Sequence, residues 1–178
     1  MQKDIFKRLI ADSQEKDLAS VIYRDIEIPL DTGKIISLIG VRRSGKTHVL
    51  YSMISNLRKT VDPRNIVYIN FEDDRLFPLE LKDFNTLLDA YYELYPNKKN
   101  EKVYFFFDEI QNVQNWEKFI RRLYDTENCS IFLTGSSAKL LSREIATALR
   151  GRTLSYEVFP LSFSEYLRFK GIKTDGHS

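Results

Sequence analysis

The chain has 178 residues, of which 43% are hydrophobic and 29% are charged, and its formal net charge is +2. These values are ordinary for one globular domain, and the near-neutral charge excludes a global basic field for nucleic acid or membrane surfaces. The sequence shows neither the ~20 apolar residues of a membrane span nor the apolar core of a signal peptide. Its one cysteine, Cys129, cannot form an internal disulfide, so we expect a cytoplasmic protein in a reducing compartment.

Helical periodicities and apolar runs alternate from the N-terminus onward. Residues 3–10 place apolar side chains at helical spacing and predict a short first helix. Apolar runs predict strands over residues 33–40, 65–73, 103–108, 130–135 and 153–159. Helical spacing predicts helices over residues 46–59, 81–95, 116–125 and about 138–149, and a turn is expected over 162–169, after Pro160. This alternation predicts one α/β domain whose parallel sheet is covered on both faces.

The stretch GVRRSGKT, from Gly40 to Thr47, matches the phosphate-loop (Walker A) pattern G-x-x-x-x-G-K-[ST] between a predicted strand and a predicted helix. Gly40 and Gly45 would let the backbone approach phosphate oxygens, with the amides of residues 43–47 pointing at the anion. Lys46 is expected to contact the β- and γ-phosphates, and the Thr47 hydroxyl to complete the coordination of Mg²⁺. The residues expected to bind the nucleotide are Gly40, Arg43, Ser44, Gly45, Lys46, Thr47 and His48. A glycine-containing turn that matches by chance is the alternative.

Three residues in or next to this loop carry side chains that the pattern does not require. His48 has no partners at metal-ligand spacing, so an ordinary helix position is its simplest role. Arg42 and Arg43 are either solvated loop tips or contacts for another domain or a nucleic acid. The sequence leaves both interpretations open.

An acidic pair, Asp108 and Glu109, ends the predicted strand 103–108. The first acid is typical of a Walker B strand, where it holds Mg²⁺ through water, and the second can activate the water that attacks the γ-phosphate. Neighbouring residues on a strand point to different sides, so the two carboxylates can serve metal and water separately. Acids that merely cap a strand at the solvent edge, as Glu72 and Asp73 can, are the alternative. The phosphate loop upstream favours Asp108 as a metal ligand and Glu109 as a general base.

The sequence also distinguishes between nucleotides and reactions. The guanine-reading pattern N-K-x-D is absent, because residues 97–100 read NKKN. ATP or ADP with Mg²⁺ is therefore the expected cofactor. A small-molecule kinase would generally place its base elsewhere, so the acidic pair favours ATP hydrolysis.

Several stretches together resemble a known family. They are GVRRSGKT, VYINFED, FFFDEIQNVQNWEKF, FLTGSSAKLLSREIATALRGR and YEVFPLSFSEYL. The chain resembles, over about residues 35–169, the prokaryotic AAA+-type ATPases, whose phosphate-loop domain usually precedes a C-terminal region of uncertain function. These P-loop NTPases are related to the archaeal ATPases and to replication initiators. The resemblance implies a three-layer α/β/α sandwich with a five-stranded parallel sheet of order 5-1-4-3-2.

The resemblance also implies two further catalytic roles. Thr134 or Ser136 would be sensor 1, which hydrogen-bonds the attacking water or the γ-phosphate; a cap on the following helix, by Ser136 or Ser137, is the alternative. Arg152, which fits better than Arg150, would be an arginine finger or sensor that neutralises phosphate charge in the transition state, in its own subunit or in a neighbour. A surface arginine without a role is the alternative. The expected catalytic residues are then Lys46, Glu109, Thr134 and Arg152.

Family members usually continue with a lid and a further domain. We therefore expect residues 1–178 to form one ATPase domain, with its core over about 20–160 and with 161–178 as the start of a linker to a C-terminal effector region absent from this chain. The adenine contacts left to this chain would come from residues 22–24.

The leading hypothesis is a Mg²⁺-dependent ATPase that couples nucleotide state to a partner domain or macromolecule, with homo-oligomer formation left open. A nucleotide-dependent switch with little hydrolysis is the first alternative. The second is a DNA-processing helper, whose phosphate contacts would come from Arg42, Arg43, Arg121, Arg122, Lys139 and Arg143.

Overall fold

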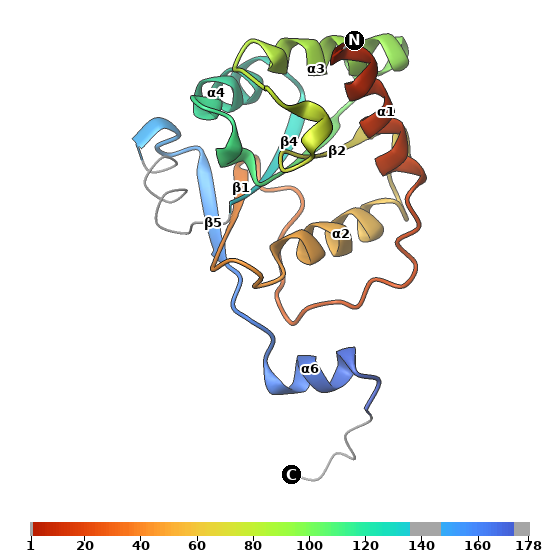
Figure 1. Cartoon of the computed structure of the whole chain (residues 1–178), viewed down its shortest axis with the longest axis vertical. Coiled ribbons are helices and arrows are strands. Elements are labelled where there is room, and N and C mark those ends of the chain that lie inside the picture. The colour runs from red at the N-terminus through yellow and green to blue at the C-terminus, as the bar shows by residue number, and fades with distance from the viewer. Residues whose placement is uncertain (1, 136–146, 173–178) are drawn as a thin grey trace.

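The computed structural model describes residues 2–135 and 147–172 (Figure 1). In this part of the chain five strands form one sheet: β1 (Ile35–Ile39), β2 (Ile66–Asn70), β3 (Val103–Asp108), β4 (Cys129–Thr134) and β5 (Thr153–Glu157). The strands are paired in the order β2-β3-β4-β1-β5, and each pair is parallel. The predicted order 5-1-4-3-2 is the same order counted from the other edge, so this prediction is confirmed.

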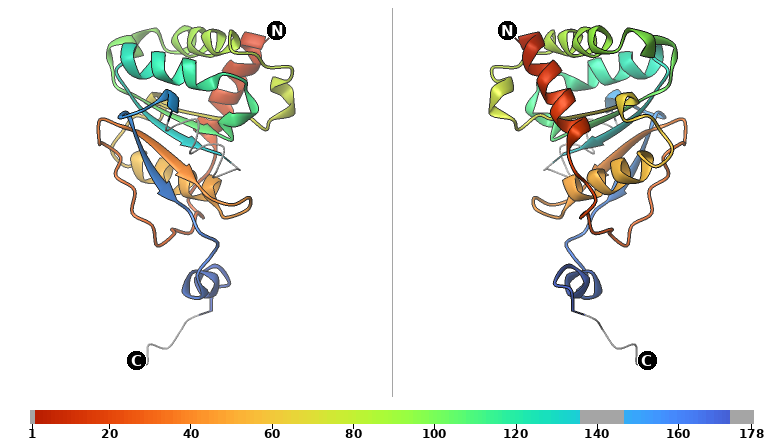
Figure 2. Two further views of the ribbon diagram at one scale, coloured as in Figure 1. Left: turned by 90° about the vertical axis from the view of Figure 1, so that its left-hand side faces the viewer. Right: turned by 90° about the vertical axis from the view of Figure 1, so that its right-hand side faces the viewer.

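Helices cover both faces of the sheet (Figure 2). One face packs against α1 (Gln2–Glu15), α3 (Asp83–Leu94) and α4 (Trp116–Thr126), and the other against α2 (Lys46–Leu57). Successive side chains of a strand point to opposite faces. Phe105 and Phe107 of β3 therefore belong to the first core, and Phe106 belongs to the second. The three-layer sandwich is confirmed.

The central strands are apolar on both faces, which is why continuous apolar runs encode them. Every residue of β3 except Tyr104 is buried. Its Phe106 ring stacks on Phe132 of β4, with the ring centroids 4.5 Å apart. This buried strand carries Asp108 at its carboxyl end, and the side chain of that acid is 1% exposed.

Short 3-10 helices complete the described connections: η1 (Pro63–Asn65), η2 (Asp74–Leu76), η3 (Pro96–Asn100) and η4 (Ile110–Asn112). The first helix is longer than the predicted 3–10. The predicted helix over about 138–149 lies mostly outside the described residues. None of the helices in the described ranges is long and apolar enough to cross a membrane.

The C-terminal helix α6 (Phe163–Phe169) lies beyond the carboxyl end of β5 and apart from the sheet (Figure 1). The turn predicted over residues 162–169 is therefore wrong. The side chain of Ser162 accepts a hydrogen bond from the Glu165 amide at 3.2 Å, and the Glu165 carboxylate accepts one from the Ser162 amide at 2.8 Å. This capping box stabilises a helix of two turns. The S-x-x-E pattern that encodes it is visible in the sequence.

Candidate active site

The loop between β1 and α2 has a backbone that requires glycine at two positions. Gly40 has φ 154° and Gly45 has φ 94°, both in the region that side chains other than glycine rarely adopt. A Cβ atom at Gly40 would lie 2.4 Å from the carbonyl oxygen of Val158, which follows β5. The loop therefore packs against the end of β5 at a distance that only glycine allows.

The first amides of α2 are suited to an anion. Backbone N–H groups in the first turn of a helix have no intrahelical acceptor, and the helix dipole favours negative charge there. Gly45 is the N-cap of α2 and contributes no side-chain cap. A phosphate group fits this cradle, because it would supply the missing acceptors.

Lys46 lies at the start of this helix and is 4% exposed. Its ammonium group donates hydrogen bonds to the carbonyl oxygens of Gly40, at 3.2 Å, and Val41, at 3.0 Å. The lysine thus folds back over the loop and lies beside the cradle. A phosphate oxygen bound in the loop would compete with these carbonyl oxygens for the ammonium group.

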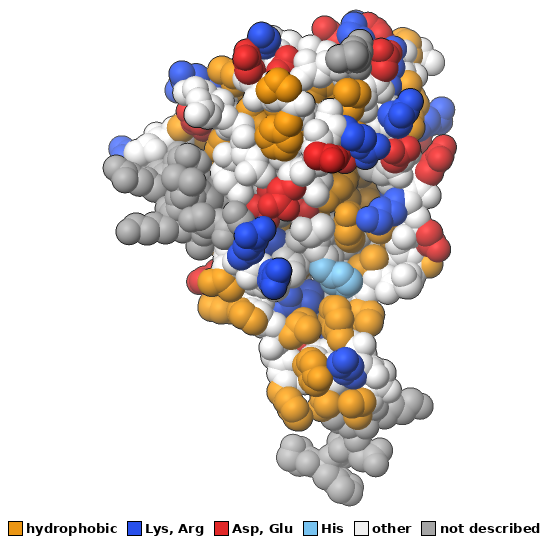
Figure 3. All heavy atoms as spheres, viewed as in Figure 1, with side chains coloured by type: hydrophobic (Ala, Val, Ile, Leu, Met, Phe, Trp, Pro, Cys, Tyr) orange, Lys and Arg blue, Asp and Glu red, His pale blue; other side chains and the backbone are white. Residues whose placement is uncertain are grey.

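Three carboxylates act on the charge of this lysine. Burial lowers the pKa of Lys46, whereas the negative charges of Glu109, Asp108 and Glu72 oppose that lowering. The fold has therefore brought the phosphate loop and the acidic pair to the same end of the sheet. Figure 3 shows acidic side chains gathered beside Lys and Arg side chains on one face, next to an apolar surface around the C-terminal segment.

The carboxylate of Asp108 is oriented by two hydroxyl groups from neighbouring strands. Thr134, the last residue of β4, donates a hydrogen bond to Oδ1. Tyr68 of β2 donates one to Oδ2 at 2.8 Å. Thr134 is 0% exposed, and its hydroxyl oxygen also accepts a hydrogen bond from the Glu109 amide at 2.9 Å. One threonine therefore connects both members of the acidic pair.

Glu109 leaves the strand in a left-handed backbone conformation, with φ 54°. Its carboxylate accepts a hydrogen bond from the side-chain amide of Gln111 at 2.7 Å. Asp108 is held by strand hydroxyls, whereas Glu109 is held from η4. The two adjacent carboxylates thus have different surroundings, as separate roles in metal binding and water activation would require.

Tyr68 is a residue of the site that the sequence patterns did not indicate. Burial, the negative charge of Asp108 and the nearby Tyr51 raise the pKa of Tyr68 well above its usual range. Tyr51 of α2 donates a hydrogen bond to the Tyr68 hydroxyl at 3.3 Å, and Lys16 donates one to Tyr51 at 2.9 Å. No local signal marks Tyr68, because its role depends on the pairing of β2 with β3.

Thr134 lies beside the acidic pair, as the sensor 1 prediction requires. Its hydroxyl is engaged by Asp108 and Glu109, so its contacts in the structure are those of a residue that orients the two acids. Contact with the attacking water stays a prediction. Ser136, the other sensor 1 candidate, and Ser137, which with Ser136 was the alternative helix cap, lie outside the described residues.

Arg152 does not lie near the phosphate loop of its own chain. The amide of Ile35, the first residue of β1, donates to the Arg152 carbonyl oxygen at 2.8 Å, whereas the loop follows Ile39 at the other end of that strand. Five residues of strand span roughly 16 Å. The Arg152 guanidinium instead donates to Asp125 at 3.2 Å. A role in the same subunit is not supported by this geometry, and a role in a neighbouring copy stays a prediction.

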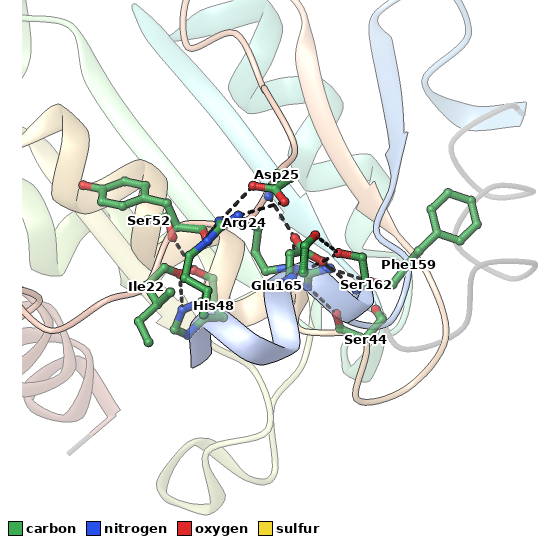
Figure 4. A network of polar contacts seen from close by, with 12 residues as sticks. Ile22, Arg24, Asp25, Ser44, His48, Ser52, Phe159, Ser162 and Glu165 are labelled. Atoms are coloured by element: carbon green, nitrogen blue, oxygen red, sulfur yellow. Dashed lines mark hydrogen bonds and ion pairs between the residues drawn. The ribbon is translucent and has the colours of Figure 1, made fainter. Parts of the chain in front are cut away.

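The segment expected to contact adenine lies against the loop and α2 (Figure 4). The side chain of Arg24 donates to the Ser44 carbonyl oxygen at 2.8 Å, and Nε2 of His48 lies 2.6 Å from the carbonyl oxygen of Ile22. These side chains are occupied by contacts within the chain. Adenine binding by residues 22–24 stays a prediction.

The oxygen donors present are suited to magnesium. Mg²⁺ is usually held by one or two protein oxygens together with phosphates and water. The Asp108 carboxylate and the Thr47 hydroxyl are oxygen donors of this kind, and their binding of Mg²⁺ stays a prediction. The described ranges contain no cluster of three or more His, Cys, Asp or Glu side chains that could hold a metal ion without such help.

The sheet order, the glycine loop entering α2 and the acid at the end of β3 define a P-loop NTPase fold. The family model described as "AAA domain" matches residues 32–167. The chain belongs to this family of AAA+-type P-loop ATPases, which are nucleotide-binding proteins.

Two relatives show how much of a longer protein this domain represents. The chain is 49% identical over 170 residues to uncharacterized protein MJ1544 of Methanocaldococcus jannaschii, a match that covers 95% of this chain and 36% of the relative. It is 40% identical over 144 residues to an uncharacterized protein of Haemophilus influenzae, covering 80% of this chain and 35% of the relative. The chain thus spans about a third of the length of these curated relatives.

Two solved structures share the fold at low sequence identity. The structure of C. elegans PCH-2 has a TM-score of 0.52 and 17% identity, over 95% of this chain and 44% of that one. The Aeropyrum pernix ORC1 protein in complex with DNA has a TM-score of 0.53 and 12% identity, over 96% of this chain and 48% of that one. At such identities the likeness concerns the fold alone.

Proposed function

We propose that this domain binds ATP with Mg²⁺ and hydrolyses it, and that nucleotide state is coupled to a further part of the protein or to a partner. The observation that carries the proposal is the hydrogen-bonded group of Asp108, Thr134 and Glu109. A protein that only binds phosphate needs no more than the loop and Lys46. A second, differently held acid beside the metal-binding one is useful for activating water.

The residues would divide the work as follows. The amides at the start of α2 and the ammonium group of Lys46 bind the phosphates, and Lys46 gives up a loop carbonyl to do so. Thr47 and Asp108 hold Mg²⁺, which neutralises phosphate charge when bound. The carboxylate of Glu109 accepts a proton from water, and Thr134 maintains the position of both acids.

Coupling to a partner is supported by the lengths of the relatives, which are about three times the matched segment. It is also supported by α6, which lies apart from the sheet but is linked to the phosphate loop through Arg24, a residue that hydrogen-bonds both Glu165 and Ser44. Self-association and DNA binding stay predictions, and the formal net charge of +2 gives DNA binding no global electrostatic support.

Two variants test the enzymatic part. Lys46→Ala should weaken binding of a fluorescent ATP analogue by at least about 100-fold, as expected when a charged phosphate contact is lost. Glu109→Gln should bind the analogue normally but release phosphate from ATP at least about 100-fold more slowly. Glu117→Gln, on the first turn of α4, is the matched control and should leave both values unchanged. Hydrolysis at the wild-type rate by Glu109→Gln would show that this acid is not the base.

A further inference from the structure

The guanidinium group of Arg24 connects three separate parts of the chain (Figure 4). Nη1 donates to the carbonyl oxygen of Ser44 in the phosphate loop at 2.8 Å. Nη2 donates to the carbonyl oxygen of Phe159, just after β5, at 2.8 Å. Nε donates to Oε1 of Glu165 in α6 at 2.7 Å. One planar group thus joins the loop, the end of the sheet and the C-terminal helix.

The contact with the loop is close as well as polar. A Cβ atom added at Gly45 would lie 2.7 Å from Nη1 of Arg24. The guanidinium therefore packs directly against the residue that precedes Lys46. It also binds the Ser44 carbonyl, so it restricts the orientation of the peptide that leads into the phosphate cradle.

The contact with α6 is a buried ion pair. The side chains of Arg24 and Glu165 are each 6% exposed. The Glu165 carboxylate also accepts hydrogen bonds from the amides of Asp25, at 2.9 Å, and Ser162, at 2.8 Å. These contacts, with that of Arg24 the largest, lower the pKa of Glu165 to about 2. Because the pair is buried, removing one partner leaves an uncompensated charge.

Two other contacts hold α6 but reach the loop less directly. The ring of Phe169 lies beside that of His48 in α2, with centroids 5.2 Å apart. Arg168 pairs with Asp25 at 2.8 Å and donates to the Tyr23 carbonyl oxygen at 3.1 Å. The Arg168–Asp25 pair is about half exposed, with side chains 45% and 53% accessible. It binds α6 to the N-terminal segment without touching the phosphate loop.

We propose that Arg24 is a positioning residue that holds the phosphate loop and α6 in one arrangement, so that nucleotide in the loop changes how firmly α6 is held. The inference rests on the proposed nucleotide binding and specifies the contacts through which bound nucleotide affects α6. A phosphate bound in the loop orders residues 44–46 and fixes the Ser44 carbonyl. This strengthens the hydrogen bond from Arg24 to Ser44, and the ordered guanidinium in turn holds Glu165. By linkage, a better-held α6 favours nucleotide binding to the same extent.

The test measures nucleotide affinity and the state of α6 in the same samples. Amide hydrogen exchange is followed in peptides covering residues 160–172, with and without saturating ADP and Mg²⁺, and the affinity is measured with a fluorescent ADP analogue. In the wild type, nucleotide should slow exchange in α6. Arg24→Met should remove this nucleotide-dependent difference and weaken binding about tenfold, the effect of losing one charge-assisted hydrogen bond.

Arg168→Met is the matched control. It breaks an ion pair of α6 and should speed exchange there in both states, but it should keep the nucleotide-dependent difference and lose less nucleotide affinity than Arg24→Met. Arg24→Lys keeps the charge and the pairing with Glu165, but one ammonium group cannot replace the three directions of the guanidinium. This variant should remain folded and still lose most of the coupling, so the loss cannot be attributed to misfolding, as it could for Arg24→Met alone.

A double-mutant cycle separates coupling from general stability. Glu165→Gln should weaken nucleotide binding in the wild type but have no further effect in the Arg24→Lys background, because its influence passes through the guanidinium. Additive effects, or an unchanged response of α6 in Arg24→Met and Arg24→Lys, would overturn the inference while leaving nucleotide binding intact. Absence of nucleotide binding by the wild type would contradict the proposed function itself, and the coupling with it.

Discussion

The hydroxyl of Thr134 donates a hydrogen bond to the carboxylate of Asp108, joining the carboxyl ends of two adjacent strands within the interior. The same oxygen accepts the amide of Glu109 at 2.9 Å. A single side chain therefore orients the acid expected to hold the metal and fixes the backbone of the acid expected to activate water. The acidic pair is a positioned group and not a solvated strand end.

Thr134→Val should slow ATP hydrolysis by about 10- to 100-fold, the usual effect of losing a contact that orients a metal-binding acid. The valine keeps the shape of threonine but leaves Asp108 and the Glu109 amide without this partner. Binding of fluorescent ADP in the absence of Mg²⁺ should stay within a few-fold of the wild type. Thr134→Ser keeps the hydroxyl and should retain most of the activity. Equal rates for the valine and serine variants would contradict this role.

Tyr68→Phe should weaken the binding of Mg²⁺ at the site, because Oδ2 of Asp108 loses the hydroxyl that lies 2.8 Å away. We expect the Mg²⁺ concentration for half-maximal hydrolysis to rise about tenfold, within the range for residues behind a metal ligand. Tyr104→Phe, on β3, is the control and should leave it unchanged. A similar shift in both variants would point to a general effect of removing a phenol.

Gly40→Ala should destabilise the protein by about 3 kcal/mol or more, because it combines backbone strain with a forced shift of packed backbone. The added Cβ would lie 2.4 Å from the Val158 carbonyl oxygen. Gly33 also has a positive φ, of 64°, but a Cβ there meets nothing within 4 Å. Gly33→Ala should therefore cost only about 1 kcal/mol, the strain alone. Urea unfolding of the two variants checks the difference.

Glu165 should contribute to acid sensitivity. Its pKa in the folded state is about 2, against an ordinary value of 4.5, so its stabilising effect is fully present above pH 4.5 and is lost as the pH falls towards 2. The free energy of unfolding of Glu165→Gln should therefore lie below that of the wild type at pH 6, and the gap should narrow at pH 3. Urea unfolding at each pH measures both free energies. A difference between the two proteins that stays constant from pH 6 to pH 3 would contradict this prediction.

Arg152→Ala tests whether this arginine acts between copies of the chain. At protein concentrations where the chain is monomeric, hydrolysis should equal that of the wild type, because Arg152 lies at the amino end of the sheet and pairs with Asp125. Loss of that partly exposed pair should cost at most ~1 kcal/mol. A loss of activity in Arg152→Ala, restored by mixing with the Glu109→Gln variant, would instead show that the arginine acts in a neighbouring copy.

Much of the fold followed from short-range patterns. The five strands and the strand-to-helix loop were predictable because buried parallel strands are continuous apolar runs, and because the glycine positions in a phosphate loop are spaced within one turn. The sheet order came from the family resemblance. The S-x-x-E capping box of α6 is also a local pattern, and it accounts for the helix found where a turn is expected over residues 162–169.

The phosphate loop, the acidic pair and the α/β alternation can be read from the chain alone, since each depends on residues that are close in sequence. Which side chains contact the loop and the acidic pair depends on how distant segments pack together. Tyr68 reaches Asp108 through the pairing of β2 and β3, and Arg24 reaches Glu165 across 141 residues. Arg152 lies away from the loop because it precedes β5, at the amino edge of the parallel sheet, whereas the loop follows β1 at the carboxyl edge. These relations depend on register and packing, which no local pattern encodes.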